Sequence, residues 1–327
     1  MRITLSILLL APLFIFSQNE KNVTEYAKSI TPNELKELLY VYASDYFEGR
    51  ETGTRGQKKA VDFIRQFYSS HAINAAQGTE DYFQPMELNI KGKMVKTENV
   101  AAIIEGSEFP DEYIVISSHL DHVGIQNGMI HNGADDDGSG TVAAMEIAEA
   151  FMLAKKAGQG PRRSVLVMAV SGEEKGLLGS KYYTDHPIYP LEKTVANLNI
   201  DMIGRIGDFK DNPNYVYLIG ADRLSQELHD ISEQVNKEHI GLELDYTFNE
   251  EDDPNRYYYR SDHYNFAKNN IPVIFYFNGI HEDYHKVTDT VEKIDFQKIE
   301  TITRLVFLTA WELANRDERI VVDKIKN

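Results

Sequence analysis

The chain has 327 residues, of which 42% are hydrophobic and 26% charged, and this length allows one large α/β domain or two small ones. A formal net charge of −17 disfavours binding to nucleic acid or to anionic membranes, so we expect neither as a partner. The absence of cysteine excludes disulfides, thiolate nucleophiles and Cys-ligated zinc, so any metal site must use His, Asp and Glu.

The first 17 residues have the layout of an export signal. Met1-Arg2 carries one positive charge and precedes an apolar run over residues 3–16, which is too short to span a membrane comfortably. A buried N-terminal helix is the alternative. We expect residues 1–17 to be a signal peptide that directs export to the periplasm or the extracellular space. No later segment reaches roughly 18 consecutive apolar residues, so no membrane contact is expected after the signal is removed.

Residues 18–97 are predicted to form a small helical segment that packs on the main domain. Thr31-Pro32 is a typical helix start, and apolar residues recur at helical spacing after it. The glycine-rich stretch 47–56 predicts a loop, and the pattern over residues 60–67 predicts an amphipathic helix. The segment is too short for a large inserted domain.

Strands and helices alternate over residues 98–327, the predicted main domain. Strands separated by helices predict an α/β fold in three layers, with a mostly parallel, twisted sheet between two layers of helices. Such sheets bind ligands beyond the carboxyl ends of their strands. The predicted strands cover residues 100–104, 113–117, 164–170, 195–200, 215–219 and 271–277, and the predicted helices cover residues 140–153, 179–184, 225–237 and 296–314.

Five polar clusters lie close to these strands, where the fold rule places ligands. Their side chains are imidazoles and carboxylates, which suit Zn²⁺, and they are numerous enough for two ions that share one carboxylate. We therefore expect the clusters to converge on one site. They are Ser118–His122, Asn132–Gly140, Ser171–Gly176, Asn199–Met202 and His281–His285.

Two of the clusters contain a pairing with its own chemical logic. In His119-Leu-Asp121-His122, the aspartate is placed to fix the tautomer of one of the histidines if that histidine binds metal. In Glu173-Glu174, adjacent carboxylates at a strand end point in different directions, so one can bind metal while the other accepts a proton from bound water. This division of labour is typical of a metallohydrolase.

The order of the motifs matches one known family. The motifs are His119-Leu-Asp121, Gly133-Ala-Asp-Asp-Asp-Gly-Ser-Gly140, Glu173-Glu174-Lys-Gly-Leu177, Leu198-Asn-Ile-Asp201-Met202 and His285-Lys-Val-Thr-Asp-Thr290. Over residues 45–315 the chain resembles metallopeptidase family twenty-eight, which contains dizinc aminopeptidases of secreted bacterial type and glutamate carboxypeptidases. The resemblance implies the zinc-dependent exopeptidase architecture and two Zn²⁺ ions as cofactors. The stretch 47–54 also resembles a segment that precedes the catalytic region in bacterial members.

The resemblance implies five metal ligands. Asp136 would bridge the two zinc ions. His119 and Asp201 would complete one metal site. Glu174 and His285 would complete the other.

The resemblance also implies the catalytic groups. Glu173 would be the general base and acid, Asp121 would support a ligand from behind, and Tyr284 resembles a tyrosine that stabilises the oxyanion in some members. Zinc lowers the pKa of bound water toward about 7, so Glu173 would take its proton and hydroxide would attack the scissile carbonyl. The implied function is an exported dizinc metallo-exopeptidase that removes N-terminal residues from peptide substrates.

Four alternatives stay open. A carboxypeptidase of the same family would need arginines for the substrate carboxylate, and Arg205 and Arg260 are candidates. A glutaminyl cyclase resembles this fold but uses one zinc, and His119, as the expected extra ligand, argues against it. A non-catalytic relative would lack ligands that are present here. His281-Glu-Asp-Tyr-His285 matches the His-Glu-x-x-His pattern of zincins, but that pattern works on a helix and a short polar connection is predicted here.

Several polar residues near the motifs are interpreted without a catalytic role. Asp135 and Asp137 are assigned structural roles. His122 and His131 are interpreted as bystanders. His263 and the run Tyr257–Tyr259 either line the substrate pocket or pack in the core. No sequence feature indicates an oligomeric state.

Overall fold

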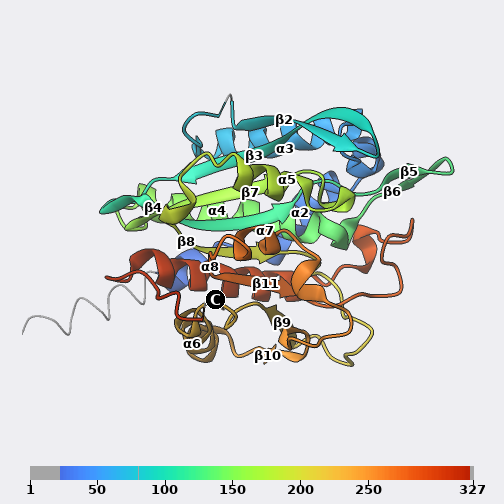
Figure 1. The fold of residues 1–327 in the computed structure, drawn as a ribbon. Helices are drawn as coiled ribbons and strands as arrows, with labels where there is room; N and C mark the ends of the chain where they lie inside the picture. Colours follow the sequence, from blue (N-terminus) through green and yellow to red (C-terminus); the bar gives the residue numbers. More distant parts are fainter. Residues whose placement is uncertain (1–22, 80, 325–327) are drawn as a thin grey trace, which may run out of the picture.

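A twisted sheet runs through the middle of the molecule, and helices pack on both of its faces (Figure 1). In the computed structural model, which describes residues 23–79 and 81–324, nine strands form this sheet in the order β1-β3-β7-β4-β8-β11-β9-β10, with β2 paired to β3. Its strands are β1 (Asn74–Ala75), β2 (Phe83–Ile90), β3 (Lys93–Ile104), β4 (Phe109–His119), β7 (Arg163–Val170), β8 (Thr194–Ile200), β9 (Tyr215–Ile219), β10 (Glu243–Asp245) and β11 (Val273–Phe277). A separate hairpin joins β5 (Gly124–Gln126) and β6 (Met129–His131).

The centre of the sheet is parallel and its flanks contain antiparallel pairs. β7, β4, β8 and β11 are neighbours and run parallel. β3 lies antiparallel to β7 on one side, and β9 lies antiparallel to β11 on the other. The predicted α/β fold with a mostly parallel sheet is confirmed in this centre. The carboxyl ends of the four central strands therefore meet along one edge.

Alternation along the central strands divides the core into two layers. Along β7, Val165, Val167 and Ala169 face one layer of helices, whereas Leu166 and Met168 face the other. Every residue of β7, β8 and β11 is buried. Strands covered on both faces need such continuous apolar runs, which is why the sequence pattern predicted them.

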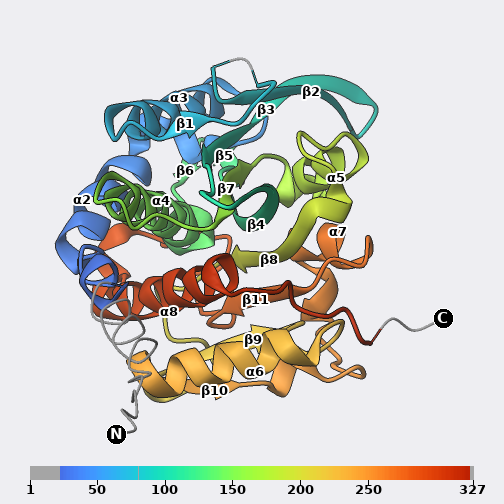
Figure 2. The same cartoon turned by 90° about the vertical axis from the view of Figure 1, so that its left-hand side faces the viewer.

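The longer helices cover one face of the sheet, and two short helices lie on the other (Figure 2). α4 and α8 pack on the first face beside α2, α3 and α6, and α5 and α7 pack on the second. The helices are α2 (Pro32–Tyr42), α3 (Arg55–Ser70), α4 (Gly140–Lys156), α5 (Leu178–Asp185), α6 (Gln226–Val235), α7 (His263–Ala267) and α8 (Phe296–Asn315). Among the described residues, no helix has the length and apolarity to cross a membrane. The predicted signal peptide, residues 1–17, lies outside the described part.

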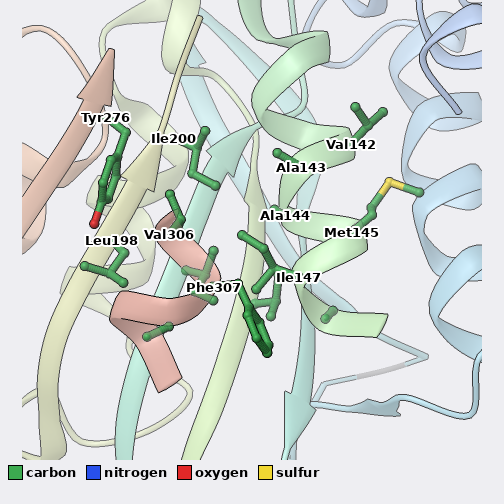
Figure 3. Close-up of a cluster of buried hydrophobic side chains, with 14 of the residues drawn as sticks. Val142, Ala143, Ala144, Met145, Ile147, Leu198, Ile200, Tyr276, Val306 and Phe307 are labelled. Atoms are coloured by element: carbon green, nitrogen blue, oxygen red, sulfur yellow. The ribbon is translucent and has the colours of Figure 1, made fainter. Parts of the chain in front are cut away.

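Helix α4 is apolar on most of its surface because it lies between the sheet and other helices. Ala144 and Ile147 of α4 face Ile200 of β8 and Phe307 of α8, and Met145 points to the opposite side (Figure 3). Burial of one such large apolar side chain stabilises the fold by about 1.5–3 kcal/mol. The helix is therefore firmly held, and so is the polar turn that leads into its first residue.

The predicted N-terminal helical segment, residues 18–97, is only partly correct. Within the described residues α2 and α3 form as predicted, but residues 74–97 form β1, β2 and part of β3. The predicted boundary between residues 97 and 98 falls inside β3, which pairs with β7 of the main sheet. In β2, buried Met86 and Leu88 alternate with exposed neighbours. This short period-two pattern is a weaker signal than the apolar runs of the central strands, and it was not recognised.

Candidate metal centre

The five polar clusters meet at the carboxyl ends of the parallel strands. β4 ends at His119, and the pair Glu173-Glu174 follows β7. Asp201 follows β8 directly, and His285 lies in the connection after β11. The remaining cluster forms the turn before α4 and contributes Asp136. His119 and His285, which are more than 160 positions apart in the sequence, are thus brought to the same site.

Two groups of side chains form around Asp136, one on each carboxylate oxygen. Oδ1 lies 3.2 Å from Nε2 of His119, which also lies 3.5 Å from Oδ1 of Asp201. Oδ2 lies 2.9 Å from Nε2 of His285, which also lies 3.2 Å from Oε2 of Glu174. Asp136 therefore stands between two sets of potential ligands, as a bridging carboxylate would.

Buried oxygens without a hydrogen-bond partner show that these groups suit cations. Oδ2 of Asp136 and Oε1 of Glu174 are buried, and neither accepts a hydrogen bond from the described residues. An unsatisfied buried polar group costs about 1–3 kcal/mol, and more if it is charged. Imidazole and carboxylate atoms at these separations match the ligand chemistry of zinc. The residues present therefore fit zinc.

Carboxylates dominate the electrostatics of both groups. Burial disfavours a charged His285, but the carboxylates of Asp136 and Glu174 outweigh burial and raise the pKa of this ring to about 10. Burial likewise disfavours a charged His119, but the nearby carboxylates, Asp201 foremost, raise its pKa well above the usual range. Both raised pKa values show that the surrounding carboxylates stabilise a positive charge at these positions. A bound metal ion would also supply that charge.

Asp121 positions the backbone of Glu173 rather than the ring of His119. Its Oδ1 accepts hydrogen bonds from the N–H groups of Gly172 (2.8 Å) and Glu173 (3.2 Å). Its Oδ2 accepts one from the Thr52 hydroxyl at 2.7 Å. The carboxylate is 3.9 Å from Nδ1 of His119, which lies 3.0 Å from the backbone oxygen of Asp121. The histidine is therefore supported by the Asp121 carbonyl group, and the carboxylate holds the Glu-Glu turn.

Glu173 has the electrostatic setting of a proton acceptor. Burial raises the pKa of its carboxyl well above the usual range. A charged His119 opposes this shift, and the carboxylates of Asp201 and Asp262 add to it. A buried carboxyl group with a raised pKa binds a proton more readily than an exposed one, which suits a group that accepts and returns a proton.

A buried chain of hydrogen bonds positions Asp201. Ser261 donates from its hydroxyl to Oδ2 of Asp201 at 2.7 Å, which leaves Oδ1 facing His119. Asn199 donates to the Ser261 hydroxyl at 2.9 Å, and Ser117 donates to Asn199 at 2.6 Å. Ser261 lies outside the five clusters, and no sequence signal pointed to it.

The turn that carries Asp136 is held through its backbone. Asp289 accepts hydrogen bonds from the N–H groups of Asp135 (3.0 Å) and Asp136 (3.2 Å). Asp137 accepts one from the N–H of His119 at 3.0 Å and so ties the turn to the end of β4. Both oxygens of Asp137 accept hydrogen bonds from backbone N–H groups, although Asp137 also lies with His119 and Asp201 in a group whose ligand atoms are within 4.8 Å of one another. Asp289 belongs to the last motif, but its role was not predicted.

His281 belongs to neither group. Its Nε2 lies 3.1 Å from Oδ2 of Asp135, and residues 281–285 form a turn instead of a helix. Glu282 is exposed to solvent. The zincin arrangement requires both histidines on one helical face, so the structure contradicts that alternative.

The glycine-rich stretch 47–56 before α3 binds the backbone of two segments that carry potential ligands. Arg50 is fully buried, and its guanidinium donates to the backbone oxygens of Leu120 (3.1 Å), Asn132 (2.6 Å) and Gly133 (2.9 Å). It therefore joins the cluster after β4 to the turn before α4. Gly49, at φ +68°, lies against the β5–β6 hairpin so closely that a Cβ would overlap backbone oxygens. Sequence analysis predicted a loop here, and the loop is an internal support.

A pocket opens beside the His119 group. Tyr284 lines it together with Glu173, and its ring stacks on His285 with centroids 3.9 Å apart. Burial and then the nearby carboxylates, Asp136 foremost, raise the pKa of Tyr284 above its usual range, so its hydroxyl stays protonated and can donate. The rest of the wall is largely apolar and consists of Met202, Tyr257, Arg260, Phe275, Phe277 and Ile280.

His122, which sequence analysis interpreted as a bystander, lies against the second group. Its ring is fully buried, with Nδ1 at 3.0 Å from Oε1 of Glu174. His131, the other predicted bystander, lies outside both groups and approaches the backbone oxygen of His285 at 3.1 Å. The only sequence signal for His122 was its place directly after the His-x-Asp motif.

Comparison with known proteins gives the family. A parallel sheet with imidazole–carboxylate groups at its carboxyl edge already places the chain among metal-binding α/β proteins. The family model described as peptidase family M28 matches residues 99–310, more than half of the chain. The chain belongs to peptidase family M28.

Curated relatives carry the names of exopeptidases. A probable leucine aminopeptidase of Arthroderma benhamiae is 27% identical over 296 residues, which are 86% of this chain and 76% of that protein. The probable glutamate carboxypeptidase LAMP1 of Arabidopsis thaliana is 37% identical over 109 residues, which are 33% of this chain. This match covers only 15% of the plant protein, so the chain spans a small part of that relative.

Solved structures share the fold. The LapA aminopeptidase of Legionella pneumophila matches with a TM-score of 0.71 at 21% identity, over 91% of this chain and 76% of that chain. The glutaminyl cyclase of Porphyromonas gingivalis matches with a TM-score of 0.67 at 17% identity, over 85% of this chain and 97% of that chain. These likenesses confirm the predicted architecture. Because an aminopeptidase and a cyclase share it, the chemistry must be argued from the site.

Proposed function

We propose that the chain is a metallo-exopeptidase that uses two zinc ions and removes N-terminal residues from peptides. The observation that carries the proposal is the position of Asp136, whose two carboxylate oxygens face His119 at 3.2 Å and His285 at 2.9 Å. A carboxylate shared by two ligand sets suits a pair of zinc ions in a hydrolase. The family and the names of the relatives support the same chemistry.

The proposed reaction divides the work among a few side chains. A bound zinc pair supplies an acidified water molecule and positive charge for the developing oxyanion. Glu173 lines the pocket on a backbone that Asp121 holds, and its raised pKa lets it take a proton from water and return it to the leaving amine. Tyr284 keeps its hydroxyl proton and donates a hydrogen bond to the oxyanion.

The charges of the pocket favour the amino end of a peptide. Glu173 lines the pocket and belongs to neither ligand group, so its carboxylate can attract a free ammonium group when Asp136 and Asp201 hold zinc. Arg205, one candidate for carboxylate binding, pairs with Asp283 at 3.0 Å and is not part of the lining. The apolar wall suits an apolar side chain on the residue that is removed.

Arg260 supports a second candidate, a carboxypeptidase of the same family. This arginine is exposed, lines the pocket and lies with its Cζ 4.9 Å from the ring centre of Tyr257. Its guanidinium lies against Tyr257 at the wall of the pocket, where it can bind the terminal carboxylate of a substrate.

We also propose that residues 1–17 direct export, because a positive charge followed by a short apolar run is typical of a signal peptide. The mature enzyme would act in the periplasm or outside the cell. Mass spectrometry of the exported protein tests this. An N-terminus near residue 18 is expected, and an intact Met1 on the exported protein would contradict the proposal.

Hydrolysis of a matched peptide panel tests the proposed activity. The panel contains free-amine peptides, the same peptides with an acetylated N-terminus, and peptides that begin with glutamine. Zinc-loaded protein is expected to release N-terminal residues from free-amine peptides only, and a chelator should stop this until zinc is restored. Release from the carboxyl end of acetylated peptides would favour the second candidate. Cyclisation of glutamine without hydrolysis would indicate a cyclase, and no conversion of any peptide would point to a non-catalytic relative.

A further inference from the structure

The side chain of His122 lies inside the candidate metal centre, although none of the five motifs assigns it a role. Its ring is fully buried. Nδ1 lies 3.0 Å from Oε1 of Glu174 and 3.7 Å from Oδ2 of Asp136, and the three side chains offer ligand atoms within 4.8 Å of one another. The ring of His285 lies edge-on to it, with centroids 5.6 Å apart. Both histidines therefore contact the same two carboxylates.

His122 approaches Glu174 without a well-aligned hydrogen bond. Nδ1 of His122 lies 3.0 Å from Oε1 of Glu174, and both buried atoms lack an aligned hydrogen-bond partner among the described residues. Nε2 of the same ring has no such partner either. Buried polar atoms of native proteins rarely stay unpaired. An imidazole that faces two carboxylates in this way is arranged as a ligand of a cation between them.

The surroundings keep the ring of His122 in this orientation. A Cβ on Gly133 would lie 2.5 Å from the ring atoms Cγ and Cδ2, so the backbone of this glycine packs directly on the imidazole. Arg50 holds that backbone, because it donates to the Gly133 carbonyl at 2.9 Å. A ligand that is fixed before the ion arrives loses little freedom on binding.

We propose that Nδ1 of His122 is a protein ligand of the metal ion on the Glu174 side. The inference rests on the two-zinc centre proposed above. With His122 as a ligand, the ion on the Glu174 side has two imidazoles and two carboxylates. The ion on the Asp201 side then has one imidazole and two carboxylates. Four protein ligands close a zinc site, whereas three leave a position for water or substrate.

The pocket lies on the Asp201 side, where the ion would have only three protein ligands. His119, Asp136 and Asp201 line it, but His122, Glu174 and His285 do not. The ion with three protein ligands would therefore face the substrate, and the ion held by His122 would be the more tightly bound of the two. Zinc should leave the Asp201 side first when a chelator is added.

Zinc binding by His122→Ala and His122→Gln tests the inference. Wild-type protein is expected to hold two zinc ions with about 1.5 imidazoles per zinc in X-ray absorption, since three rings would serve two ions. In both variants one ion should bind on the order of 10- to 100-fold more weakly, and the count should fall to about one imidazole per zinc once both ions are loaded. The matched control is His263→Ala. Its ring is also fully buried and unpaired, but it stacks on Phe275 and belongs to neither group.

The possible results separate the inference from the proposal beneath it. Wild-type zinc affinity with an unchanged imidazole count in both variants overturns the inference. Lower activity with an unchanged count also overturns it, because His122 would then only position Glu174. A wild-type chain that binds fewer than two zinc ions contradicts the two-zinc centre itself. If the variants do not fold, wild-type protein decides alone, since about one imidazole per zinc excludes His122 as a ligand.

Discussion

At the scale of the residue, the site depends on which oxygen of each carboxylate stays free. Asp201 gives Oδ2 to the hydroxyl of Ser261 and keeps Oδ1 for the His119 group. Asp136 presents one oxygen to each group. Exchange of a carboxylate for a carboxamide keeps the shape but replaces one acceptor by a donor, so such exchanges are sharp probes of these roles.

Glu173→Gln should lower kcat by about 10²–10⁴ because the amide cannot accept a proton from water. Zinc content should stay near that of the wild type, since Glu173 belongs to neither group of potential ligands. Steady-state kinetics and elemental analysis of the same preparation check both parts. Normal turnover by this variant would refute the assignment of the base.

Four of the five expected ligands lie at or after the carboxyl ends of central strands, and Asp136 lies in the turn before α4. The place of the site could therefore be predicted from the fold, whereas the ligand roles come from the resemblance to the family. The supporting residues could not be predicted. Ser261 and Asp289 reach the site only because long connections fold back over it, and sequence patterns do not encode that path. His122 follows the same strand as His119, but its side chain reaches the other group because the chain turns after β4.

At the scale of the element, the loop between α2 and α3 and the turn before α4 act as one support. The fully buried Arg50 joins them through three backbone oxygens. The strands of the main sheet that were not predicted from the sequence, β1, β2 and β10, lie at its two flanks, away from the central strands whose ends carry the ligands. Their omission therefore changed the domain boundary but not the predicted site.

Arg50→Lys should lower the free energy of unfolding by about 3 kcal/mol or more. Lysine cannot reach three carbonyl groups at once, and a hydrogen bond to a charged group contributes about 1.5–3 kcal/mol. Denaturant unfolding of the zinc-free protein measures this. The control is Arg55→Lys, whose side chain is 79% exposed and should change stability by less than about 0.5 kcal/mol. Equal effects of the two substitutions would contradict the role of Arg50.

Glu146→Gln should stabilise the protein at high pH. Glu146 is buried in α4, and burial first, then the charges of Glu149 and Glu34, raise its pKa from 4.5 to about 8. Ionisation is easier in the unfolded chain, so this group reduces stability as pH rises from 4.5 to about 8. The variant should gain on the order of a few kcal/mol above pH 8 and nothing below pH 4.5. Thermal melting across this range would contradict the prediction if the gain did not change with pH.

At the scale of the whole molecule, metal binding and folding are linked. The ligands come from the ends of several strands, so an unfolded chain presents no assembled site. The net charge of −17 adds repulsion that bound cations reduce.

Zinc at about 100 times its dissociation constant should stabilise the fold by about 2.7 kcal/mol per site, because it binds the folded chain only. Calorimetry with and without a chelator measures this effect on the melting temperature. Asp136→Ala removes the shared carboxylate and should lose most of the response. A variant that keeps the full zinc response would contradict the bridging role of Asp136.

The centre draws its first supporting residue from Arg50 and its last from Asp289. Most of the chain, up to Asp289, must therefore have been synthesised before the whole centre can close. If the chain is exported as proposed, a precursor held extended across a membrane would contain every ligand in its sequence and still be unable to cut a peptide. Because the ligands are spread along the chain, the enzyme can cleave peptides only after folding has brought them together.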